Sequence, residues 1–158
     1  MPRVKAKTIA LTVALCLVRA TMCFASDDVH MGTWRLNEPK SKFSAGATRY
    51  SVVIVQAAGD EMTVSVGGTD RDGKPTHNQW RGKFDGKDYA VTGSPNEDMR
   101  SYTKIDDHTL GFNSKKDGEI TVSCRIVVSA DGKSRTVTAS GTDQGKKFHE
   151  RCDIYDKQ

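Results

Sequence analysis

Four Asp-Gly pairs divide this 158-residue chain, from residue 72 onward, into short segments rich in β-branched and aromatic residues. The pairs stand at residues 72–73, 85–86, 117–118 and 131–132. Aspartate followed by glycine adopts at low cost the positive φ angles of a two-residue loop whose twist matches that of its flanking strands. The four pairs therefore predict hairpin turns and an antiparallel, all-β chain.

The first 25 residues have the pattern of a secretory signal peptide. Three basic residues among the first seven precede an apolar run over residues 9–18, and Cys23-Phe24-Ala25 provides a cleavage site. The run is half as long as the roughly 20 residues of a membrane-spanning helix. We expect cleavage of residues 1–25, no transmembrane anchor afterwards, and export of the mature protein to the periplasm or the exterior. A lipid-modified Cys23 is an alternative, although Met22 stands where a small residue would be expected.

Removal of this segment changes the charge balance. The chain carries 24 basic and 20 acidic residues, and residues 1–25 hold four of the basic ones and none of the acidic ones. The mature chain, residues 26–158, therefore has a formal net charge of zero. This balance gives no argument for binding nucleic acid or an anionic membrane surface. The length suits one domain.

Ten segments between turn signals have the composition of strands, and several alternate apolar and polar residues, as at Met62, Val64 and Val66. No stretch has sustained helical periodicity, although one helical turn fits near residues 38–43 with Asn37 as its cap. Tight hairpins and the cost of exposed sheet edges favour an up-and-down meander of about ten strands closed into a barrel over a two-sheet sandwich. The predicted strands are residues 30–36, 48–57, 61–68, 76–84, 87–92, 99–105, 108–115, 119–129, 134–142 and 146–156.

Cleavage would leave two cysteines, Cys124 and Cys152. Two cysteines in an exported protein suggest one disulfide. The turn pattern opposes this, because it places them on the first and third strands of a meander, about 10 Å apart, and a bridge needs Cα atoms within about 7 Å. A possible disulfide between Cys124 and Cys152 stays open at this point.

The segment Met31-Gly32-Thr33-Trp34 resembles the Gly-x-Trp opening of the calycin superfamily, which contains the lipocalins and the fatty-acid-binding proteins. The predicted strand number and the length are also similar to those of fatty-acid-binding proteins. The resemblance implies that Gly32 lets the first strand bend across a closed barrel end and that Trp34 plugs that end. It also implies that a basic residue of the last strand, here Arg151, packs over the indole.

The chain differs from fatty-acid-binding proteins at two points. Residues 38–47 are too few for the helical pair that those proteins insert between their first two strands. Their last strand commonly holds a ligand carboxylate with an Arg-x-Tyr motif, whereas Arg151 and Tyr155 are four residues apart, on one face of a strand. The chain also resembles small exported bacterial proteins that are described only as lipocalin-like.

A ten-stranded barrel encloses more space than side chains fill easily, so its aromatic and aliphatic residues are candidates for a cavity wall. We predict an exported, monomeric barrel that binds an apolar or amphipathic small molecule inside, without catalysis or cofactor. Complete filling of the interior by side chains is the alternative structure. The candidate lining residues are Tyr50, Val52, Ile54, Val64, Trp80, Phe84, Tyr102, Leu110, Phe112, Arg151 and Tyr155.

A different function is also open. Loops at one end of a barrel, such as residues 92–98 together with the hairpin at residues 115–118, suit an envelope protein that binds or inhibits another protein.

Two groups of residues partly match catalytic motifs. Ser101 and Lys104 fit Ser-x-x-Lys, but residues three apart on a strand point to opposite faces. The Asp106-Asp107-His108 segment combines acids with a histidine, but it lies in a tight turn, where ordinary pKa values are expected.

No metal site is predicted. Asp70 and Asp72 partly match a calcium loop that lacks its other acids, and they suit a turn instead. The four histidines, His30, His77, His108 and His149, lack ligand spacing and are expected to be exposed on strands or turns.

Overall fold

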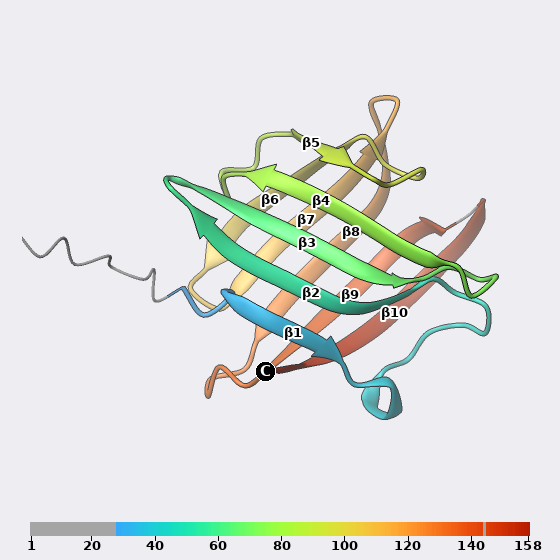
Figure 1. Cartoon of the computed structure of the whole chain (residues 1–158), viewed down its shortest axis with the longest axis horizontal. Helices are drawn as coiled ribbons and strands as arrows, with labels where there is room; N and C mark the ends of the chain where they lie inside the picture. Colours follow the sequence, from blue (N-terminus) through green and yellow to red (C-terminus); the bar gives the residue numbers. More distant parts are fainter. Residues whose placement is uncertain (1–27, 144) are drawn as a thin grey trace, which may run out of the picture.

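Ten antiparallel strands close into one barrel (Figure 1). The computed structural model describes residues 28–143 and 145–158, so the predicted signal peptide lies outside the described residues. Each strand pairs with its neighbour in sequence, and β1 pairs with β10 to complete the wall. The strands are β1 (Gly32–Leu36), β2 (Arg49–Ala58), β3 (Glu61–Thr69), β4 (Pro75–Gly82), β5 (Tyr89–Thr92), β6 (Met99–Asp106), β7 (Thr109–Lys116), β8 (Glu119–Val128), β9 (Ser134–Asp143) and β10 (Lys146–Lys157). The predicted all-β meander is confirmed, and its segments agree with these strands within a few residues.

The predicted helical turn is present in a shorter form. A 3-10 turn, η1 (Glu38–Lys40), follows β1, and the Asn37 side chain accepts a hydrogen bond from the backbone N–H of Lys40. The turn ends there because Lys42 exchanges two backbone hydrogen bonds with Cys152 of β10. Sequence reasoning extended the turn to residue 43 because it had no signal for this pairing.

Only one of the four Asp-Gly pairs is a two-residue hairpin loop. Asp117 and Gly118 join β7 to β8 with φ angles of 50° and 83°. The pairs at 72–73 and 131–132 lie in longer turns, and the pair at 85–86 lies in the wide loop between β4 and β5. In the first of these, the Asp70 carboxylate accepts the backbone N–H groups of Asp72 and Lys74, both at 2.9 Å. The pairs mark turns correctly, but they do not set the lengths of the loops.

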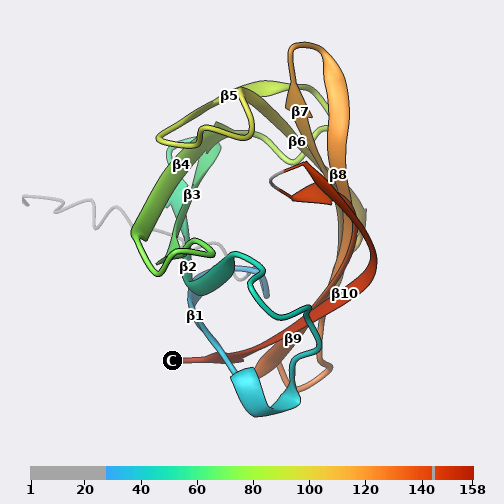
Figure 2. The same ribbon diagram turned by 90° about the vertical axis from the view of Figure 1, so that its right-hand side faces the viewer.

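The barrel has two different ends. At the closed end, residues 28–31 and Trp34 cover the interior, and the loops after β2, β4, β6 and β8 lie around them. The open end, which faces the viewer in Figure 2, carries the other loops and the connector, residues 37–48, between β1 and β2. Within the described residues, no helix is long and apolar enough to span a membrane.

The apolar core fills the half of the barrel next to the closed end. Trp34 and Trp80 are fully buried, and Trp80 packs edge-on against Tyr102 with 4.7 Å between the ring centroids. Full burial of one such side chain is worth roughly 1.5–3 kcal/mol. The core also contains Val53, Val55, Val64, Leu110, Ile126, Val128 and Tyr155.

The prediction of which β2 side chains face the interior is wrong by one residue. Val53 and Val55 belong to the buried core, whereas the predicted Val52 and Ile54 alternate with them and point away from it. Residues 52–55 are all apolar, so alternation could not indicate which face of this strand is buried.

Candidate ligand cavity

A cavity of about 140 Å³ lies inside the barrel on the open side of the aromatic core. Five of the predicted residues line it: Tyr50, Tyr102, Phe112, Arg151 and Tyr155. The predicted Val64, Trp80, Phe84 and Leu110 instead form or flank the core. A substantial part of the wall is polar, which the predicted set of mainly apolar residues did not include.

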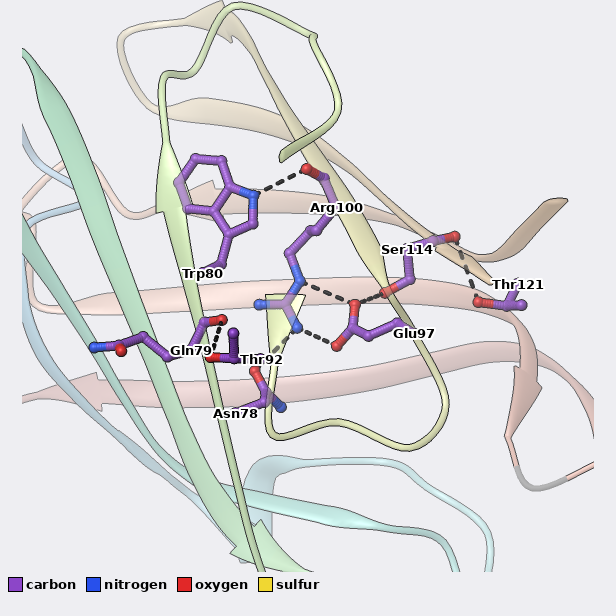
Figure 3. Close-up of polar contacts among 8 residues, drawn as sticks. All are labelled: Asn78, Gln79, Trp80, Thr92, Glu97, Arg100, Ser114 and Thr121. Atoms are coloured by element: carbon purple, nitrogen blue, oxygen red, sulfur yellow. Dashed lines mark hydrogen bonds and ion pairs between the residues drawn. The ribbon is translucent and has the colours of Figure 1, made fainter. Parts of the chain in front are cut away.

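Arg100 of β6 is held by hydrogen bonds to Glu97 and Asn78 (Figure 3). Its guanidinium donates through Nε and Nη2 to the two carboxylate oxygens of Glu97, and Nη2 also donates to Asn78 Oδ1 at 3.0 Å. Ser114 Oγ donates to the same carboxylate. Since Arg100 and Glu97 are both buried, each charge neutralises the other in a region of low dielectric constant.

A second buried pair, Arg151 and Asp153, lies on β10. Arg151 Nε donates to both carboxylate oxygens of Asp153, at 3.0 and 2.9 Å. Burial raises the pKa of Asp153, and the guanidinium opposes this shift. Arg151 is only 8% exposed, yet its Nη2 has no hydrogen-bond partner among the described residues. The pair therefore retains a donor that a ligand acceptor would satisfy.

Arg151 does not take the predicted position over Trp34. Its guanidinium lies 5.4 Å from the Phe43 ring centroid and 5.3 Å from that of Tyr50, near the open end. Arg135 of β9 and Lys157 of β10 lie over Trp34 instead, each with its charged group 5.1 Å from the indole. The β10 residues that pair with β1 are Tyr155, Asp156 and Lys157, and Arg151 is not among them.

Gly32 and Trp34 both lie at the closed end of the barrel. Gly32 has a φ of 115°, and a Cβ there would lie 2.9 Å from Lys157 Cε. The Trp34 indole N–H donates to the His30 carbonyl oxygen at 2.9 Å. The first strand can thus cross close to β10 while Trp34 closes the barrel.

Arg135 is a buried cation with no ion-pair partner among the described residues. It is 5% exposed, its Nε has no described hydrogen-bond partner, and burial lowers its pKa. Arg135 lines the cavity at its floor, where its guanidinium also lies 4.8 Å from the Tyr155 ring centroid. Sequence reasoning missed it because an arginine in an alternating strand is normally assigned to the exposed face.

A bulge in β10 turns two side chains into the cavity. Phe148 and Arg151 are three residues apart, but they pair with Gly141 and Ala139, which are two residues apart on β9. The extra residue lets Phe148 and Arg151 share the inner face, as the cavity lining shows. Glu150, inside the bulge, has a φ of 55°, which is rare for a residue other than glycine.

The two cysteines within the described residues, Cys124 and Cys152, are free thiols. Cys124 lines the cavity, whereas Cys152 alternates with the inward-facing Arg151 and Asp153 and so lies on the other face of the wall. Burial raises the pKa of Cys124 to about 12, so this thiol remains protonated at neutral pH. The sequence left a Cys124–Cys152 bond open, and the structure does not contain it.

The partial catalytic motifs lie away from the cavity. Lys104 Nζ pairs with Asp107 at 2.9 Å in the turn after β6, whereas Ser101 is buried. The pKa of Asp106 is below its ordinary value because the His108 backbone N–H donates to the carboxylate, so the expectation of ordinary values in this turn was incorrect.

The expectation of exposed histidines is wrong for His30, which is 1% exposed at the closed end. Burial lowers its pKa to about 4. Within the described residues, no three His, Cys, Asp or Glu side chains gather as metal ligands would.

Comparisons with models of protein families, with curated proteins and with solved structures each found no match. The closed, ten-stranded antiparallel barrel is compatible with a calycin-like fold.

Proposed function

We propose that this protein is an exported, lipocalin-like barrel that binds a small amphipathic molecule with an acidic group inside its cavity, without catalysis. The observation that carries the proposal is the buried Arg151, whose Nη2 lacks a described partner at the cavity wall. Arginine presents parallel N–H donors that match a carboxylate. A bound acid would satisfy this group.

The cavity size limits the ligand. An engineered protein cavity of about 150 Å³ binds benzene, so a space of about 140 Å³ takes a body of similar size. Apolar groups from Val137, Ala139 and Phe112 line the same space as Arg151. These residues suit an acid with a small apolar ring or a short branched chain.

Titration of the mature chain with benzoate, and with benzamide as its neutral counterpart, tests the proposal by calorimetry. We expect benzoate to bind at least ten times more tightly, because only the carboxylate pairs with a buried guanidinium. Arg151→Lys keeps the charge beside Asp153 but removes the planar donor pair, so it should weaken benzoate binding. Arg125→Lys, on an exposed residue of β8, is the matched control.

A second variant separates the cavity from the charge. Ala139→Leu adds apolar volume to the cavity wall and leaves Arg151 in place, so it should abolish benzoate binding. Equal affinity for benzoate and benzamide would remove the acidic group from the proposal. If neither compound nor a fluorescent apolar probe binds, interior ligand binding is excluded for this size class.

The protein-interaction alternative is favoured by one observation. The Asp98 backbone N–H donates to the Lys115 carbonyl oxygen, and the Asp98 carboxylate accepts the Asp117 N–H, both at 2.9 Å. The loop after β5 and the β7–β8 hairpin thus form one continuous rim at the open end. Asn96→Arg on this exposed rim should abolish capture of a partner from envelope extract, if the rim is the binding surface.

A further inference from the structure

A groove of about 800 Å³ lies beside the cavity at the open end. One wall is formed by residues 41–47 of the connector, and the other by residues 146–151 of β10. Arg71, in the β3–β4 turn, adds to the lining. Figure 2 shows the connector running between the start of β2 and β10. The groove and the cavity share Phe148 and Arg151 in their linings, so they adjoin.

The groove exists because β1 is short. Residues 34–36 of β1 pair only with residues 155–157 of β10, which leaves the first half of β10 without a strand partner on that side. The connector spans the gap and is fixed to β10 by the two backbone hydrogen bonds between Lys42 and Cys152, at 2.7 and 2.9 Å. The position of Lys42 on the groove wall is thereby set by the backbone.

Charge is concentrated in this groove. Five of its fourteen lining residues are lysine or arginine, and Glu150 is the one acid among them. Lys42, Arg71, Lys146 and Lys147 are exposed, and none makes an ion pair with a residue whose side chain the structure describes. The expected mature chain is neutral, so this local excess of positive charge belongs to the groove and not to the chain as a whole.

The groove contains more basic side chains than protection of a sheet edge requires. Lysines on an unpaired strand discourage contact with other chains, which accounts for Lys146 and Lys147 alone. Lys42 and Arg71 come from two other segments and converge on the same space, and the buried Arg151, which also lines the cavity, lies at its inner end. Convergence of cations from three segments is the pattern of a site for a multiply charged anion.

We infer that the groove binds a phosphate-bearing group with at least two negative charges. The lysines supply point charges and Arg71 and Arg151 supply planar donors, both of which suit phosphate oxygens. The volume lies in the range of small-molecule sites. Such a phosphate belongs either to a soluble molecule or to an anionic phospholipid head group. The inference does not depend on an acid bound inside the barrel.

Two binding measurements on the mature chain distinguish the sources. Inorganic pyrophosphate is titrated by calorimetry at low and at physiological salt, and vesicles of phosphatidylglycerol are compared with vesicles of phosphatidylcholine by co-sedimentation. Binding of pyrophosphate alone indicates a soluble ligand, and binding of phosphatidylglycerol vesicles alone indicates a head group. Either result supports the site, and the absence of both overturns it.

Matched variants locate the binding. Lys146→Gln with Lys147→Gln should weaken binding at least tenfold, because each lysine near a phosphate contributes severalfold to affinity. Arg125→Gln with Lys133→Gln removes the same charge from exposed positions elsewhere and should leave binding unchanged. An equal loss in both double variants would mean diffuse attraction and would overturn the site. Ala139→Leu, which fills the cavity, should retain pyrophosphate binding, so failure of the interior proposal is distinguishable from failure of this one.

Discussion

The guanidinium of Arg135 lies 5.1 Å from the ring centroid of Trp34, so the side chain that plugs the closed end is covered by a cation without an acidic partner among the described residues. A desolvated cation–π contact is worth about 2 kcal/mol. The effective cost of burying an ion is several kcal/mol. The two contacts of Arg135, with Trp34 and with Tyr155, together return about 4 kcal/mol, so they do no more than offset the cost of burial.

This balance predicts that Arg135→Met is at least as stable as the natural chain. Methionine keeps most of the packing volume and removes the buried charge. Arg135→Ala should lose about 2–4 kcal/mol, because it leaves a void between Trp34 and Tyr155. Urea unfolding at pH 7 measures both variants. A loss of more than 2 kcal/mol in Arg135→Met would show instead that the guanidinium stabilises the plug.

Local residue patterns were sufficient to predict the barrel wall. Alternation, as at Met62, Val64 and Val66, indicates strands independently of distant residues, and Asp117-Gly118 sets a hairpin through its own φ preferences. By contrast, the inward face of β2 depends on which side packs against the rest of the core. Residues 52–55 are all apolar, so they show no alternation from which that face could be inferred.

The polar half of the cavity could not be predicted from alternation, because charged residues of a strand are normally assigned to its exposed face. Glu97 belongs to the loop before β6, and the conformation of this loop brings its carboxylate to Arg100, three residues later, and to Ser114, the partner of Arg100 on β7. Phe148 and Arg151 share a face because of a bulge in β10. The sequence from residue 146 to residue 154 contains no glycine that would indicate a bulge. The groove likewise depends on the short pairing of β1 with β10, which no local pattern encodes.

Glu97→Gln is predicted to destabilise the protein by about 3–5 kcal/mol, as measured by urea unfolding. The amide preserves the shape but leaves Arg100 buried without a counter-charge, which is the costly way to break a buried pair. Glu119→Gln, on an exposed residue at the start of β8, should change stability by less than about 0.5 kcal/mol. Adding Arg100→Met to Glu97→Gln should recover most of the loss. Failure to recover would mean that Glu97 acts through its loop and not through the charge of Arg100.

His30 is predicted to make stability fall as the pH drops below about 6.5. Its pKa in the folded protein is about 4, because burial disfavours the imidazolium, with Arg135 adding to this effect and Asp28 opposing it. The ordinary value is 6.5, so the unfolded chain binds the proton first on acidification. The folded state then loses about 2 kcal/mol between pH 7 and pH 5.

Unfolding of the natural chain and of His30→Leu at these two pH values tests this expectation. The leucine variant should lose much less stability on acidification, whereas His149→Gln, on an exposed residue of β10, should behave as the natural chain does. An equal pH dependence in the natural chain and His30→Leu would assign the effect to other groups.

Glu150 is predicted to store backbone strain in the bulge of β10. A left-handed conformation costs a residue other than glycine roughly 1–2 kcal/mol, and glycine adopts it freely. Glu150→Gly should therefore be about 1 kcal/mol more stable than Glu150→Ala, a comparison in which both variants lack the exposed carboxylate. If alanine is the more stable of the two in urea unfolding, residue 150 does not have a positive φ. The bulge would then not be formed as described, and Phe148 and Arg151 could not both line the cavity.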